Sequence, residues 1–139
     1  MYRYTDFDRQ FVRARAAQYR DQLERWQAGK LTDDEFKPLR LQNGWYVQRY
    51  APMLRVAVPY GEISSAQLRA MATIAREYDQ PEAALLAAAQ ERQTTLGEVP
   101  VPGGTPVATH LKTGYGHFTT RTNVQFNWIP LDRSAEVME

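Results

Sequence analysis

The sequence feature that most constrains the fold is the alternation of side chains along residues 115–128, Tyr-Gly-His-Phe-Thr-Thr-Arg-Thr-Asn-Val-Gln-Phe-Asn-Trp. Aromatic and β-branched residues alternate there with polar ones, a period of two that is typical of β-strands. The pattern predicts two short strands that meet near Arg121. One face can be buried in a core. The other presents polar side chains suited to an anionic ligand: His117, Thr119, Arg121, Asn123 and Gln125.

The overall composition argues against several classes of function. The chain has 139 residues, of which 43% are hydrophobic and 24% are charged, as expected for one modest globular domain. Its net charge of +1 gives no reason to expect binding to nucleic acid or to a membrane. The longest apolar run, residues 83–89, is too short to cross a bilayer. The N-terminal residues lack the apolar region of a signal peptide, so we expect a cytoplasmic protein.

Cysteine is absent from the sequence, and this absence limits the chemistry that the chain can carry out. Within these residues it excludes disulfides, a thiolate nucleophile, a cysteine-ligated zinc ion and a cysteine-bound iron–sulfur cluster. The two histidines, His110 and His117, lack acidic neighbours in the sequence. We therefore expect no metal site built from side chains of this chain.

Capping boxes predict the starts of three helices, at Thr5–Asp8, Thr32–Glu35 and Ser64–Gln67. We expect Gly29 to end the first helix and Pro38 to end the second. The apolar residues that recur at helical spacing in the first helix are Phe7, Phe11, Ala14, Tyr19, Leu23 and Trp26. Those of the third helix are Leu68, Met71, Ala72, Ile74, Ala75 and Tyr78. Each set predicts an amphipathic helix packed on a neighbouring element.

Two further segments have strand character. Residues 39–50 are typical of a hairpin with its turn at Asn43-Gly44. Residues 53–59 predict a buried-type strand that Arg55 interrupts. A buried guanidinium is costly unless it is paired, so Arg55 forms a structural ion pair, faces solvent or binds an anion. This strand and the third helix together make half of a split β-α-β unit.

Two further segments are the one that precedes the predicted strand pair and the last ten residues of the sequence. Residues 79–93 predict an extra helix, and the loop at 99–106 contains three prolines and two glycines. This loop lacks the Gly-Lys-Ser/Thr sequence of a phosphate-binding loop. Residues 130–139 start like a helix and stop, and we interpret this as an incomplete domain.

Several blocks of sequence resemble the siroheme-dependent nitrite and sulfite reductases. They are residues 1–12, 41–48, 53–61 and 114–128. The resemblance covers residues 1–79 and 114–139, and it implies an α+β fold. It places a helical segment at 1–38 and an incomplete ferredoxin-like half-domain (β-α-β-β) at 39–139, with a helical insertion at 80–113.

The resemblance also implies a function. The family catalyses the six-electron reduction of sulfite to sulfide or of nitrite to ammonia, with siroheme and a [4Fe-4S] cluster. Arg55 and Arg121 would then be catalytic residues, and Arg55 would bind the substrate anion at the distal face of the haem. The residues implied to lie along the siroheme carboxylates are His117, Thr119, Thr120, Arg121, Asn123 and Gln125. The implied partners are the C-terminal portion of the reductase, a ferredoxin or flavoprotein electron donor and a small oxyanion substrate.

This sequence departs from the family pattern in places that affect activity. Thr122 stands where glutamine is usual, and the four cluster cysteines and the substrate-site lysines belong to a region that these 139 residues lack. We therefore expect this chain alone to be inactive. The alternative is a non-catalytic ferredoxin-like binding module, or a truncated fragment, that pairs with another protein chain.

Overall fold

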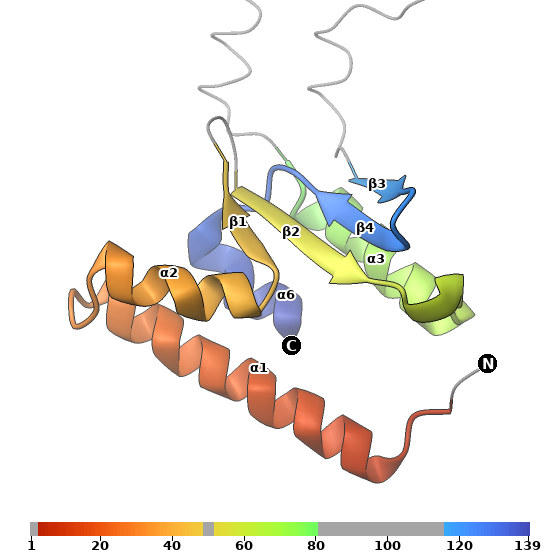
Figure 1. Cartoon of the computed structure of the whole chain (residues 1–139), viewed down its shortest axis with the longest axis horizontal. Helices are drawn as coiled ribbons and strands as arrows, with labels where there is room; N and C mark the ends of the chain where they lie inside the picture. Colours follow the sequence, from red (N-terminus) through yellow and green to blue (C-terminus); the bar gives the residue numbers. More distant parts are fainter. Residues whose placement is uncertain (1–2, 49–51, 81–115) are drawn as a thin grey trace, which may run out of the picture.

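The computed structural model describes residues 3–48, 52–80 and 116–139, which form an α+β structure (Figure 1). The helices are α1 (Asp6–Gln27), α2 (Asp33–Gln42), α3 (Ser65–Glu77) and α6 (Ser134–Met138), with short 3₁₀ helices at Pro59–Gly61 and Leu131–Arg133. The strands are β1 (Trp45–Val47), β2 (Pro52–Ala57), β3 (Gly116–Thr119) and β4 (Asn123–Phe126). The predicted helix and loop at 80–113, apart from Gln80, lie outside the described residues, as do His110 and Tyr115.

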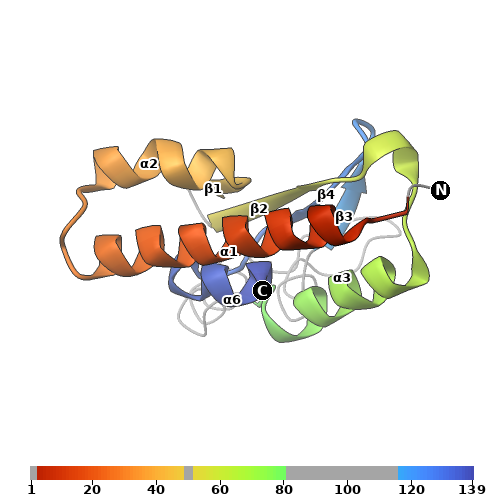
Figure 2. The ribbon, with the colours of Figure 1, turned by 90° about the horizontal axis from the view of Figure 1, so that it is seen from below.

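The four strands form one antiparallel sheet in the order β1-β2-β4-β3. β2 and β3 therefore run in the same direction with β4 between them, which is the split β-α-β arrangement that the sequence predicts. Figures 1 and 2 show α1, α3 and α6 on one side of this sheet. On the other side, none of the described helices covers β2, β4 and β3. We call this side the open face, with respect to residues 3–48, 52–80 and 116–139.

The hydrophobic core lies between the sheet and the helices on its covered side. Its buried members are Tyr19, Leu23, Phe36, Trp45, Leu54, Val58, Val124, Phe126, Ile129 and Ala135. The ring of Tyr19 stacks near those of Phe36 and Trp45, with centroid distances of 6.1 and 6.5 Å. The first two helices and the sheet thus share one core.

All three predicted capping boxes form. The hydroxyls of Thr5, Thr32 and Ser64 each accept a hydrogen bond from the backbone N–H three residues later. In α2, the backbone N–H of Thr32 donates to the carboxylate of Glu35, which lowers the pKa of that carboxyl. These contacts are local in sequence, which explains why the sequence alone predicts them.

The predicted packing of the apolar stripe of α1 on a neighbouring element does not extend to Phe7, Phe11 and Ala14, which are all exposed, with 74% of Phe7 and 59% of Phe11 accessible. The physical reason is length. α1 has 22 residues and is about 33 Å long, whereas strands of three to six residues span roughly 10–20 Å. The periodicity of α1 identifies the apolar stripe but does not indicate which part of the stripe a neighbour covers.

The predictions of a hairpin turn at Asn43-Gly44 and of a helix end at Pro38 are also wrong. α2 continues through Pro38 to Gln42, and Asn43 and Gly44 terminate it. Pro38 removes one backbone hydrogen bond, but it lies on an exposed turn of the helix, where water can reach the freed carbonyl group. Gly44 has φ +80°, the left-handed conformation typical of the residue after a helix.

Gly44 also sits very close to β2. Its carbonyl oxygen accepts a hydrogen bond of 2.9 Å from the backbone N–H of Arg55. A Cβ atom at position 44 would lie 2.5 Å from the backbone oxygen of Arg55. By contrast, Gly29 has φ +70° with no atom within 4 Å of such a Cβ, so its surroundings are open.

Candidate functional site: the open face of the sheet

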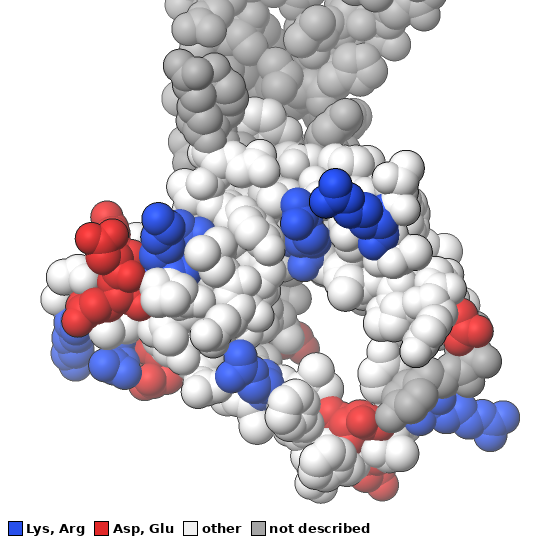
Figure 3. Space-filling model, in the orientation of Figure 1, with Lys and Arg blue, Asp and Glu red and all other residues white. Residues whose placement is uncertain are grey.

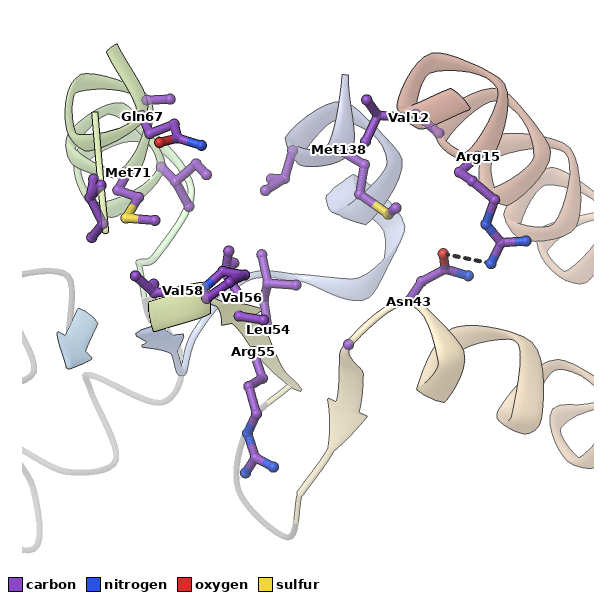
Figure 4. A pocket seen from close by; sticks show the side chains of 18 of the residues that line it. Val12, Arg15, Asn43, Leu54, Arg55, Val56, Val58, Gln67, Met71 and Met138 are labelled. Carbon is purple, nitrogen blue, oxygen red and sulfur yellow. Dashed lines mark hydrogen bonds between the residues drawn. The ribbon is translucent and has the colours of Figure 1, made fainter. Parts of the chain in front are cut away.

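β2 directs its side chains alternately to the two sides of the sheet, as the sequence predicts. Leu54, Val56 and Val58 point toward the helices, and Arg55 points in the opposite direction (Figure 4). Arg55 is exposed, while Leu54 and Val58 are buried. The guanidinium group of Arg55 therefore lies on the open face.

The strand register brings predicted site residues from three strands into one row. Arg55 of β2 pairs with Gln125 of β4, and Gln125 pairs with His117 of β3. Directly paired residues share a face of a sheet, so these three side chains follow one another across the open face. In the next row, Ala57, Asn123 and Thr119 are paired in the same way.

Arg55 is held by a residue on each neighbouring strand. The side-chain oxygen of Gln125 accepts hydrogen bonds from Nε and Nη2 of Arg55, each at 3.1 Å, when the amide is oriented with its oxygen toward the guanidinium. A guanidinium only donates, which decides that orientation. On the other side, the ring of Tyr46 lies under the guanidinium at 5.0 Å from its centroid. Within the described residues, Arg55 forms no ion pair with a carboxylate.

The turn between β3 and β4 carries the second predicted catalytic arginine. The hydroxyl of Thr119 accepts from the backbone N–H of Arg121 at 3.2 Å and donates to Oδ1 of Asn123 at 2.9 Å. Thr122 adopts φ +53°, and its carbonyl oxygen accepts from the N–H of Val58 at 2.9 Å. Thr119 and Asn123 thus fix the turn and have less capacity left for a ligand. The Arg121 guanidinium is exposed and, in the part of the chain that is described, makes no hydrogen bond or ion pair.

The open face is electropositive although the whole chain is nearly neutral. Arg55 and Arg121 are the charged residues of the four strands and of the β3–β4 turn, and no aspartate or glutamate occurs in these segments. Figure 3 shows basic side chains grouped over β2 and β4 with no acidic side chain beside them. Arg121 precedes Gln125 by four residues along the chain, a backbone distance of at most roughly 13 Å. Two long arginine side chains at this spacing can both reach an anion lying over β4.

The donor set fits carboxylate or oxyanion ligands and does not fit a metal ion. Guanidinium, hydroxyl and amide groups are the usual partners of carboxylates, which they bind through charge-assisted hydrogen bonds. No group of three or more His, Cys, Asp and Glu side chains that could hold a metal occurs among the described residues. The residues present therefore fit the carboxylates of siroheme, whereas an iron–sulfur cluster has no cysteine in the sequence to ligate it.

A cavity of about 690 Å³ lies on the other side of the sheet, between β2 and the helices α1, α3 and α6. Figures 3 and 4 show this hollow and the side chains around it. Most of its lining is apolar, with Val12, Leu54, Val56, Met71, Ile74 and Met138 among the contributors. Of the predicted site residues, only Arg55 borders it, and its side chain points away. No local sequence pattern indicates this cavity, because it results from the spacing between helices.

Comparison with protein families identifies the segment that contains Arg55. The model of the nitrite/sulfite reductase ferredoxin-like half domain matches residues 46–85. Residues 46–85 are thus similar to this half domain. The match confirms the resemblance to nitrite and sulfite reductases and the ferredoxin-like character of the α+β fold. It covers under a third of the chain, including Arg55 and Tyr46 but neither β3 nor β4.

Similarity to other proteins and the hydropathy of the helices assign no further function to this chain. Neither the curated proteins nor the solved structures yield a significant match to this chain. Among the described residues, no helix is both long enough and apolar enough to cross a membrane. The roles expected for His117, Thr119, Thr120, Arg121, Asn123 and Gln125 thus stay predictions, although the structure brings them to one sheet face and its adjoining turn.

Proposed function

We propose that this half domain supplies the anion-binding wall of an assimilatory sulfite or nitrite reductase. That enzyme would reduce sulfite to sulfide or nitrite to ammonia with six electrons. The observation that carries the proposal is the row Arg55–Gln125–His117 on an open, electropositive sheet face. Arg55 lies inside the segment that matches the reductase half domain.

Within this proposal, the two arginines have catalytic roles and their neighbours hold the cofactor. Arg55 and Arg121 attract the substrate anion and stabilise the negative charge that it carries during reduction. His117, Thr119, Thr120, Asn123 and Gln125 face the siroheme carboxylates, which Arg121 also contacts. Siroheme, when bound, supplies the iron and the conjugated ring at which electrons reach the substrate. The chain's own residues bind and orient; they do not carry electrons.

The proposal requires other polypeptide segments. The cluster cysteines and the ligand to the haem iron would come from the remaining C-terminal portion of the reductase, because the sequence contains no cysteine. Electrons would come from a ferredoxin or a flavoprotein. A cytoplasmic location stays a prediction.

Expression of the 139-residue chain together with siroheme synthesis tests the cofactor role. We expect the purified protein to show a Soret absorption band, and we expect Arg121→Ala to weaken siroheme binding about tenfold, since it removes charge-assisted hydrogen bonds. Arg13→Ala is the matched control, because Arg13 lies on α1, on the opposite side of the sheet, and is also exposed. Equal losses in the two variants would contradict a role for Arg121.

One observation favours a second candidate function, a non-catalytic module that pairs with another protein chain. β3 is an edge strand of the sheet, and its Phe118 is 63% exposed. Open strand edges invite pairing with another chain. Absence of a Soret band in the unmodified chain under all expression conditions would favour this module over the siroheme role.

A further inference from the structure

Two side chains from neighbouring strands hold Arg55 before any ligand is present. Tyr46 of β1 pairs directly with Met53, so it lies diagonally across from Arg55, within reach of an aromatic ring. Its ring centroid is 5.0 Å from the guanidinium carbon. Gln125 of β4 accepts from Nε and Nη2 on the other side. The guanidinium of this exposed arginine is therefore held between β1 and β4.

These contacts leave most of the guanidinium free for a ligand. An arginine side chain carries five N–H donors, and the ring of Tyr46 occupies none of them. Gln125 uses one donor on Nε and one on Nη2, at 3.1 Å each. The two donors on Nη1 and the second donor on Nη2 remain. One N–H of Nη1 and this N–H of Nη2 are parallel, and together they form an edge of the guanidinium that an oxyanion can bind in a bidentate manner.

We propose that Tyr46 is a positioning residue for anion binding by Arg55. Its ring fixes the plane of the guanidinium, so that the free edge is presented before the ligand arrives. A free arginine side chain samples many rotamers in water. Holding the side chain in advance reduces the rotamer entropy lost on binding. The identity of the anion rests on the proposed reductase function, whereas the ordering of Arg55 is a property of the free chain.

The ring, rather than the hydroxyl of Tyr46, makes this contact, and that distinction sets the choice of variants. Tyr46→Phe keeps the aromatic face and removes the hydroxyl. Tyr46→Leu and Tyr46→Met keep an apolar side chain and remove the aromatic face. Val47→Thr is the control on the same strand, because Val47 is 53% exposed and pairs with Pro52, which places its side chain on the opposite face of the sheet from Arg55. The second aromatic-free variant guards against misfolding of the first.

Nuclear magnetic resonance of the ¹⁵N-labelled chain tests the ordering directly. The Nε–H signal of Arg55, assigned by its loss in Arg55→Lys, should exchange slowly with solvent and report a rigid bond vector. We expect Tyr46→Phe and Val47→Thr to preserve both properties. Tyr46→Leu and Tyr46→Met should speed exchange and loosen the bond vector, while the backbone amide signals of β2 and β4 show that the sheet remains intact.

Titration with nitrite and with sulfite then measures the effect on affinity. We expect the two aromatic-free variants to raise Kd about two- to fivefold, the range set by an exposed cation–π contact, and Tyr46→Phe to stay within about twofold. Unchanged order and affinity in both aromatic-free variants would overturn the proposal, as would equal losses in Tyr46→Phe. If the unmodified chain binds neither anion but Tyr46→Leu still loosens Arg55, the positioning role stands and the reductase function fails.

Discussion

At the scale of single residues, Tyr19 joins the longest helix to the C-terminal helix. Its hydroxyl lies 2.9 Å from Oγ of Ser134, and its side chain is fully buried. Burial raises the pKa of Tyr19 to about 12, against the opposing effects of the Ser134 hydrogen bond and the positive charge of Arg40. The phenol is thus held in its neutral form by the core.

This pKa predicts a loss of stability in alkaline solution. The folded-state pKa lies above the ordinary value of 10.0, so the folded chain retains the proton more tightly than the unfolded chain. Its contribution is fully present below pH 10 and is lost as the pH rises to about 12, an effect on the order of 2 kcal/mol. Tyr19→Phe should flatten this dependence in urea unfolding measured across that range.

The same variant should lower stability near neutral pH by about 1 kcal/mol, because the hydrogen bond to Ser134 is lost. Tyr60→Phe is the control, since the Tyr60 side chain is 97% exposed and should leave the alkaline slope unchanged. A slope that persists in Tyr19→Phe would show that another group causes it.

At the scale of elements, Asp79 ties the end of α3 to the end of β4. It is fully buried, and its Oδ1 accepts hydrogen bonds from the backbone N–H groups of Asn127 at 3.1 Å and Trp128 at 2.8 Å. These groups follow the last residue of β4 and lie beyond its pairing with β2 and β3. A side chain therefore continues the hydrogen bonding where the strand ladder stops.

We expect Asp79→Ala to destabilise the fold by about 2–4 kcal/mol, because it takes the acceptor from two partly buried N–H groups and leaves a cavity at a fully buried position. Asp79→Asn retains a side-chain oxygen at that place and should cost less. Urea or thermal unfolding measures both, with Asp132→Ala as the control at an exposed aspartate. A loss no larger than that of the control would contradict the structural role of Asp79.

The local features of these elements could be predicted from the sequence, whereas the contacts between distant elements could not. Capping boxes and the alternation in β2, β3 and β4 are local patterns, so the sequence predicts them. The extent of α2 was missed because packing on the core outweighs the preference of Pro38 to end a helix. The contact between Arg55 and Gln125 depends on register between strands 70 positions apart, which no local pattern encodes. The role of Tyr46 was hidden by the wrong hairpin at Asn43-Gly44.

At the scale of the whole molecule, the sheet separates two environments. One side holds the core and the apolar cavity, and the other carries two arginines and a row of polar groups. Only the second environment suits a small oxyanion. In the proposed function this arrangement binds and orients the anion, but the sequence contains no cysteine to ligate an iron–sulfur cluster.

We therefore expect the purified 139-residue protein to show no reductase turnover, even when siroheme is provided. The assay would supply a reduced viologen dye as electron donor and would measure ammonia from nitrite and sulfide from sulfite. A complete siroheme reductase in the same assay is the positive control. Six-electron product formed by the pure chain would refute the requirement for a separate cluster-bearing segment.

The tight approach of Gly44 to the backbone of Arg55 has a consequence for how substitutions would be distributed in a selection experiment. In a library screened for anion capture, position 44 would tolerate almost nothing, although glycine there touches no ligand and carries no charge. The cause would be the close approach of two backbone segments, because a Cβ atom at position 44 would lie 2.5 Å from the backbone oxygen of Arg55. Position 29, with the same left-handed backbone and open surroundings, would accept far more. Gly44 would therefore be required for anion binding because it has no side chain, and not because it contacts the ligand.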